Sequence, residues 1–78
     1  MKAVVKFNVD LPRGGSETYE VVTTRSALRH YWRHNHQRVN WMQVDICLTR
    51  YTYTRAGGWR KRGMFRYVPN HPELWNLR

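Results

Sequence analysis

The chain has 78 residues, with 14 Lys and Arg against 5 Asp and Glu, which gives a formal net charge of +9. Its length indicates a single domain, residues 1–78, and its aromatic content excludes a disordered tail. No apolar run approaches the ~20 residues that cross a bilayer, one cysteine makes no internal disulfide, and the charged first residues do not form a signal peptide. We therefore expect a soluble, cytoplasmic protein that does not bind membranes and that has an anionic partner.

The first part of the chain has the pattern of two paired strands. Residues 2–9 alternate between apolar and polar side chains and are rich in β-branched residues, which predicts a strand. The segment 11–16 contains the Pro and Gly residues of a hairpin loop, and residues 17–23 alternate again. We expect these two strands to pair antiparallel.

A helix is predicted over residues 25–36, with Thr23 or Thr24 as its N-cap and Asn35 or Asn40 near its end. Its apolar side chains fall at i, i+1, i+4 and i+5 and form one stripe: Ala27, Leu28, Tyr31 and Trp32. The bases are expected on the opposite face: Arg25, Arg29, Arg33 and His36. Arginines spaced four apart repel one another, so this ridge favours an anionic partner or nearby acids.

The second half of the chain predicts a long strand followed by a hairpin turn. Residues 41–54 are interpreted as one strand in which the large residues change parity after Leu48, through a β-bulge or because the strand runs past the core. Residues 54–58 are a turn, and residues 59–68 are a last strand. We expect the tail 69–78 to dock on the domain. The predicted fold is α+β, a four-stranded antiparallel sheet with one helix on one face, in the order β-β-α-β-β.

The predicted hairpin from Arg50 to Tyr67 concentrates bases and aromatic rings and contains no acid. Guanidinium groups bind phosphate and carboxylate through paired charge-assisted hydrogen bonds, and aromatic side chains stack on the nucleobases of a nucleic acid. We predict that the partner is held by the cations of this hairpin, Arg50, Arg55, Arg60, Lys61, Arg62 and Arg66. Tyr53 and Trp59 would stack near the turn, and the helix ridge of Arg25, Arg29 and Arg33 would extend the charge.

These features favour a non-catalytic binding module that contacts a nucleic-acid backbone without strong sequence preference. An acidic protein surface is the alternative partner, and a basic face that is only solvated would have the same composition. No Gly-rich phosphate loop is present, paired carboxylates are scarce, and no cofactor is predicted. His30 and His34 have the spacing of two metal ligands, but nothing in the sequence brings a third ligand to them, so no metal is predicted. A homodimer through an exposed strand edge is left open.

The order of segments also resembles that of small phage-encoded inhibitor proteins, including some anti-CRISPR proteins. The resemblance covers the chain as a layout: an opening strand Met1-Lys2-Ala3-Val4-Val5, a loop, a second strand, a helix opened by Thr24 and Ser26, and a terminal hairpin. It implies steric blockade of a host protein or nucleoprotein complex, such as a CRISPR effector or the transcription machinery. It assigns no functional residue.

Overall fold

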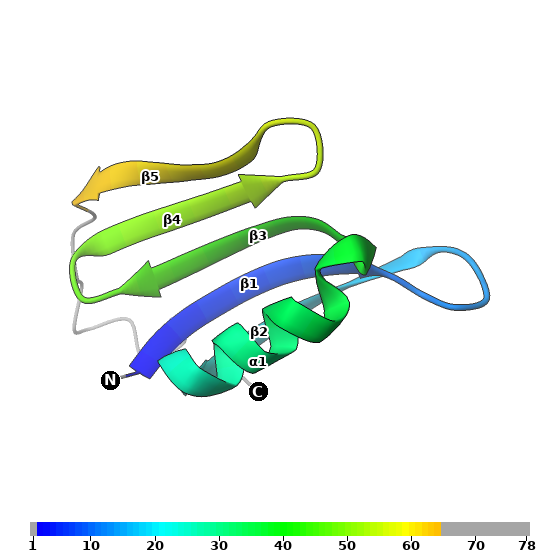
Figure 1. Ribbon diagram of the computed structural model, residues 1–78, viewed down its shortest axis with the longest axis horizontal. Coiled ribbons are helices and arrows are strands. Elements are labelled where there is room, and N and C mark those ends of the chain that lie inside the picture. Colours follow the sequence, from blue (N-terminus) through cyan, green and yellow to red (C-terminus); the bar gives the residue numbers. More distant parts are fainter. Residues whose placement is uncertain (1, 65–78) are drawn as a thin grey trace.

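The computed structural model describes residues 2–64, and for residues 62–64 it describes the backbone alone. Five strands form one antiparallel sheet in the spatial order β2-β1-β3-β4-β5, and one α-helix lies on one side of it (Figure 1). The elements follow one another as β1 (Lys2–Asp10), β2 (Ser16–Thr24), α1 (Arg25–Asn35), the 3₁₀ turn η1 (His36–Arg38), β3 (Val39–Ile46), β4 (Thr49–Thr54) and β5 (Gly58–Met64). The α+β class with a single helix is confirmed. The four-stranded sheet and the order β-β-α-β-β are wrong, because the chain runs β-β-α-β-β-β.

The additional strand arises because the predicted strand 41–54 is a hairpin. Cys47 and Leu48 form a two-residue turn, and Ile46 pairs with Thr49 across it. Such a turn pairs even-numbered residues with odd-numbered ones, so the residues of one face change parity across it. The prediction that a β-bulge, or a strand that runs past the core, causes this change is therefore wrong. Cys47 adopts a φ of 55°, in the left-handed region that residues other than Gly seldom occupy. Neither turn residue is a typical turn former, so the sequence offers no local signal for this turn.

β1 and β2 pair antiparallel along their whole length, as predicted. The loop between them is closed by a backbone hydrogen bond of 3.0 Å from the Leu11 N–H to the Gly15 carbonyl. Gly14 and Gly15 have φ values of 95° and 77°, which glycine adopts without steric cost. The predicted turn at residues 54–58 also forms, and it leads into β5. The part of the predicted last strand beyond residue 64 and the docking of the tail 69–78 lie outside the described residues.

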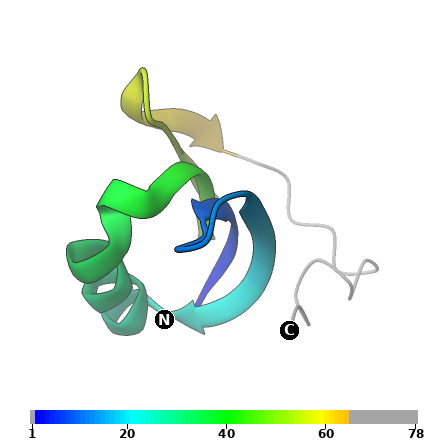
Figure 2. The same cartoon turned by 90° about the vertical axis from the view of Figure 1, so that its right-hand side faces the viewer.

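The core lies between α1 and the sheet, and Figure 2 shows the helix on one side of the strongly twisted strands. Its buried side chains come from alternate positions of β1 and from β3: Ala3, Val5, Phe7, Val9, Val39, Met42 and Val44. The helix has no fully buried residue and packs Leu28, Tyr31 and Trp32 against this core while they remain half-buried. A single short helix therefore leaves open grooves along its sides.

α1 begins at the position that its capping residue dictates. Thr24 is extended, and its Oγ1 accepts a hydrogen bond of 3.1 Å from the backbone N–H of Ala27. This bond satisfies one of the backbone donors that the first helical turn leaves without a partner. The helix ends at Asn35, whose side chain donates to the Tyr31 carbonyl. Across residues 2–64, no helix combines the length and the apolar character that crossing a membrane requires.

Candidate functional site

A groove runs between α1 and the hairpin of β4 and β5. The helix lies over β1 and β2, so the two last strands extend beyond its edge (Figure 1). The groove has a volume of about 290 Å³, and Arg25 and Arg29 line it from the helix. The remainder of its lining is apolar and aromatic and comes from α1 and the last three strands: Leu28, Trp32, Met42, Ile46, Tyr51 and Trp59.

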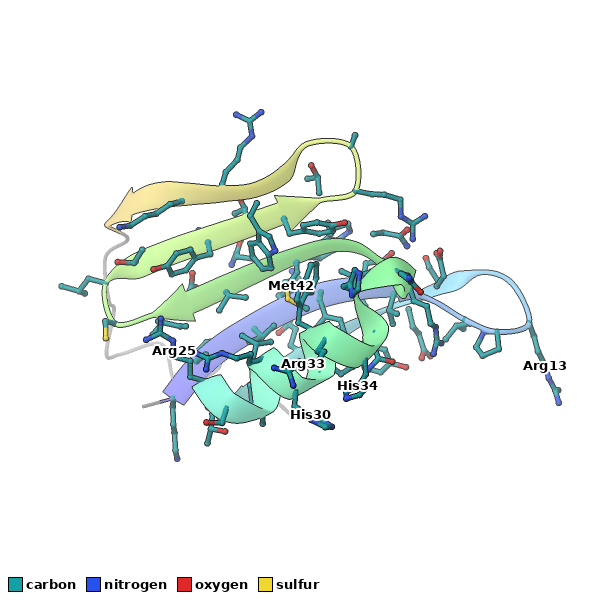
Figure 3. All side chains as sticks on the ribbon, viewed as in Figure 1. Arg13, Arg25, His30, Arg33, His34 and Met42 are labelled. Carbon is teal, nitrogen blue, oxygen red and sulfur yellow. The ribbon has the colours of Figure 1, made fainter. Side chains whose placement is uncertain are left out.

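The arginines reach this groove because of their rotation around the helix. At about 100° per residue, Trp32 lies about 40° from Leu28, Arg25 about 60°, Arg29 about 100° and Arg33 about 140°. The arginine ridge therefore follows the apolar stripe on the side of Trp32, which faces β4 and β5. The expectation that these bases occupy the opposite face is wrong for Arg25 and Arg29. Arg33 is exposed, and Figure 3 shows it pointing away from the sheet.

Three aromatic rings from three elements meet at the hairpin end of the groove. Trp32 lies edge-on to Tyr53, with ring centroids 4.7 Å apart, and to Trp59 at 5.0 Å. Tyr53 and Trp59 are directly opposite each other in the register of β4 and β5, and their centroids are 5.4 Å apart. His36 packs on Trp32 at 5.5 Å, so it too belongs to this side of the helix.

This aromatic cluster brings together the two residues that were predicted to stack near the turn. Tyr53 is half-buried against the core, whereas Trp59 keeps 44% of its surface exposed. Trp32 was missed as a site residue because its place in the helix stripe indicated only a core position. Trp32 lies one helical turn after Leu28 and is rotated toward the side of the arginine ridge. This position is the sequence signal that connects Trp32 with the site.

Two of the predicted contact residues are held by acids of the fold. Arg50 donates to Asp45 from Nε to Oδ1 at 2.8 Å and from Nη2 to Oδ2 at 3.1 Å, across the β3–β4 pair. These hydrogen bonds raise the pKa of Arg50. Arg55 donates to the Asp10 carboxylate at 2.9 Å, and this bond is the main reason why the pKa of Asp10 lies below its ordinary value. Both arginines therefore have a structural role in the fold.

The Asp10 pair belongs to a polar network that fixes the β4–β5 turn. The register of β1 and β3 shifts so that Asn40 is an extra residue, a β-bulge. The Asn40 side chain donates to Asn8 and Asp10 at 2.6 and 2.8 Å. The backbone carbonyl of Asn40 accepts from the Arg55 backbone N–H at 3.0 Å. Arg38 donates to the Asp10 carbonyl at 2.9 Å. The network anchors the turn, and therefore the position of Trp59 just beyond it.

The other predicted contact cations with described side chains form no ion pair with the described acids. All four acids with described side chains are engaged elsewhere: Asp45 and Asp10 as above, Glu20 with Lys6 at 3.5 Å, and Glu17 with the Tyr19 hydroxyl. Among the side chains that the structure describes, no ion pair involves a helix arginine or the first two bases of β5. These cations are Arg25, Arg29, Arg33, Arg60 and Lys61.

The bases of β5 are divided between the two faces of the sheet. Lys61 is opposite Tyr51, a residue of the groove lining, so it is on the groove side. Arg60 is opposite Thr52 and is on the other side. Arg62 is opposite Arg50 in the backbone register; its side chain is not described, and Arg66 lies beyond the described residues. Arg25 and Arg29 of the helix therefore line the groove, and Lys61 of the hairpin is on the same face of the sheet as the groove.

The histidines of the helix form a pair away from this groove. The ring centroids of His30 and His34 are 4.5 Å apart, and Figure 3 shows both residues along the edge of the helix that is opposite β4 and β5. Across the described part of the chain, no three His, Cys, Asp or Glu side chains gather as a metal site would require.

Comparison of the chain with protein-family models, with curated proteins and with solved structures finds no match.

Proposed function

We propose that the protein is a non-catalytic binding module that holds the phosphate backbone of a nucleic acid with the cations around the helix–hairpin groove. One observation supports this proposal above the others. The described acids are all engaged away from Arg25, Arg29 and Lys61. Arg25 and Arg29 line one groove whose other residues are apolar and aromatic, and Lys61 is on the same face of the sheet. Contacts to phosphates position a nucleic acid but do not read its sequence, so we propose binding without strong sequence preference.

The electrostatics of α1 favour an anion beside it. Arg25 and Arg29 are four residues apart, a spacing at which like charges destabilise a helix. Arg25 is also in the first turn, which has no acidic residue and where the positive end of the helix dipole disfavours a cation. A phosphate near Arg25 and Arg29 relieves both effects, and each guanidinium can donate two parallel hydrogen bonds to it.

An acidic surface of a host protein would relieve the same repulsion, and a host protein or nucleoprotein complex is the kind of partner that the resemblance to phage inhibitors implies. We prefer a nucleic acid because Arg25 and Arg29 share the groove with aromatic side chains, and aromatic rings among basic residues are typical of nucleic-acid interfaces. The two partners differ in one measurable respect. Binding to a nucleic acid releases condensed counterions, so its affinity falls steeply and linearly on a log–log plot against salt.

The test is a titration of labelled single-stranded and duplex DNA and RNA of mixed sequence at several salt concentrations. The variant Arg25→Gln with Arg29→Gln should bind more weakly, and its salt slope should be smaller by about 1.4–1.8, since each phosphate contact contributes about 0.7–0.9. The matched control is Arg13→Gln. Arg13 is exposed at the far end of the β1–β2 loop, distant from the groove (Figure 3). Absence of binding at low salt, or an equal effect of the control, would overturn the proposal, and absence of binding would direct attention to an acidic protein.

A further inference from the structure

Trp59 is the exposed aromatic residue whose surroundings suit a ligand. Three described large hydrophobic residues are substantially exposed: Trp59 at 44%, Leu48 at 42% and Tyr19 at 39%. Leu48 is in the β3–β4 turn, and Tyr19 packs on Phe7 and donates its hydroxyl to Glu17. Trp59 alone of these three lines the groove that Arg25 and Arg29 border. Its exposure therefore combines an aromatic surface with nearby positive charge.

The indole of Trp59 is held as a fixed platform. The ring centroids of Trp32 and Trp59 are 5.0 Å apart, with an interplanar angle of 63°. The ring of Tyr53, on the neighbouring strand, has its centroid 5.4 Å from that of Trp59. The turn that leads into Trp59 is anchored by the ion pair of Arg55 with Asp10. A ring whose position is set before binding loses little conformational entropy when a ligand stacks on it.

We propose that the groove accepts one unpaired base of a single-stranded nucleic acid, which stacks on Trp59 while Arg25, Arg29 and Lys61 hold the adjoining phosphates. This inference rests on the proposed function and names the form of nucleic acid. The bases of a duplex are covered by their stacked neighbours, whereas an unpaired base presents its face. The groove volume of about 290 Å³ is just below the ~300–1,000 Å³ of typical ligand pockets, which suits one flat ring system.

The experiment separates stacking from phosphate binding by removing the bases. We would measure the affinity of a mixed-sequence 12-nucleotide DNA strand, the same strand with abasic sites throughout, and the corresponding duplex. The wild-type chain should bind the intact strand more tightly than the abasic strand by about 5- to 150-fold, the factor expected for stacking of one base. Trp59→Leu should bind the two strands equally with an unchanged salt slope, and Trp59→Phe should restore part of the difference.

Intrinsic tryptophan fluorescence supplies a second measurement. The intact strand should quench the emission of the wild-type chain, and Trp59→Phe should lose most of this quenching. Trp41→Phe is the matched control, because Trp41 is paired with Thr54 and Asn8 on the other face of the sheet and should retain the quenching. Equal affinity of the wild-type chain for intact and abasic strands overturns this inference and leaves phosphate binding standing. Absence of binding to every oligonucleotide overturns both proposals.

Discussion

A substitution of Arg50 tests whether this residue stabilises the fold or binds a partner. Arg50→Met keeps the aliphatic part of the side chain and removes both hydrogen bonds to Asp45, which is only 7% exposed. Breaking a fully buried pair costs about 3–5 kcal/mol, and an exposed pair contributes about 0–1 kcal/mol. With side-chain exposures of 8% for Asp45 and 36% for Arg50, we expect the free energy of unfolding to fall by about 2 kcal/mol.

This loss is large for so small a domain. Domains of this length have a free energy of unfolding of roughly 4–12 kcal/mol. A loss of about 2 kcal/mol should lower the melting temperature of such a domain by roughly 8–16 °C. Urea unfolding and thermal unfolding followed by circular dichroism would measure the change. The double variant Asp45→Asn with Arg50→Met should recover part of the stability, because no carboxylate is then left without its partner.

The same variant tests the division of the cations. Because Arg50 is held by Asp45 on the sheet face opposite the groove, Arg50→Met should leave the salt slope of nucleic-acid binding unchanged, in contrast to the variant of Arg25 and Arg29. If the free energies of unfolding of the wild-type chain and of Arg50→Met agree within about 0.5 kcal/mol, the structural role of Arg50 is refuted. A salt slope that falls by about 0.7–0.9 would show that Arg50 binds phosphate, as the sequence alone predicted.

Three further predictions concern the elements that hold the groove in place. Asp10→Asn should destabilise the protein near neutral pH; since the carboxylate's pKa is lowered in the fold, the difference from wild type should shrink as the pH falls below the ordinary value of 3.8, as measured by urea midpoints between pH 2 and 7. Met42→Ala should cost about 2–5 kcal/mol of unfolding free energy because Met42 is fully buried; a loss below about 1 kcal/mol would contradict its place in the core. Thr24→Ala should cost about 1 kcal/mol and lower the helical circular dichroism signal, whereas Thr24→Ser, which keeps the capping oxygen, should cost less.

Much of the fold follows from local patterns. The alternation of residues 2–9 places Ala3, Val5, Phe7 and Val9 on the core face, and the glycines of the first loop permit the turn that the pairing of β1 and β2 requires. Thr24 ends β2 and caps α1 in the way that its residue type predicts. The predictions of these elements are confirmed because short-range sterics and side-chain periodicity determine them.

The Cys47–Leu48 turn was not predictable in the same way. Its residues carry no turn signature, and the pairing of β3 with β1 and β4 holds Cys47 in a left-handed conformation against its local preference. The parity change between Met42 and Tyr53 was visible, but a bulge and a two-residue hairpin both change parity. Only the observed register, in which Met42 pairs with Tyr53, distinguishes them.

By itself, the sequence determined that this protein is strongly basic, that its cations are mostly arginines, and that aromatic residues are interspersed among them. Only the tertiary structure decided which of the described cations are paired with an acid of the fold. Arg50 meets Asp45 five residues away and Arg55 meets Asp10 across 45 residues, through contacts that strand register creates. Arg25 and Arg29 come to border Trp59 in the same way, because helix rotation and sheet order place them on one groove. Charge is a property of composition, whereas its neutralisation is a property of distance, and distances between remote residues exist only in the folded chain.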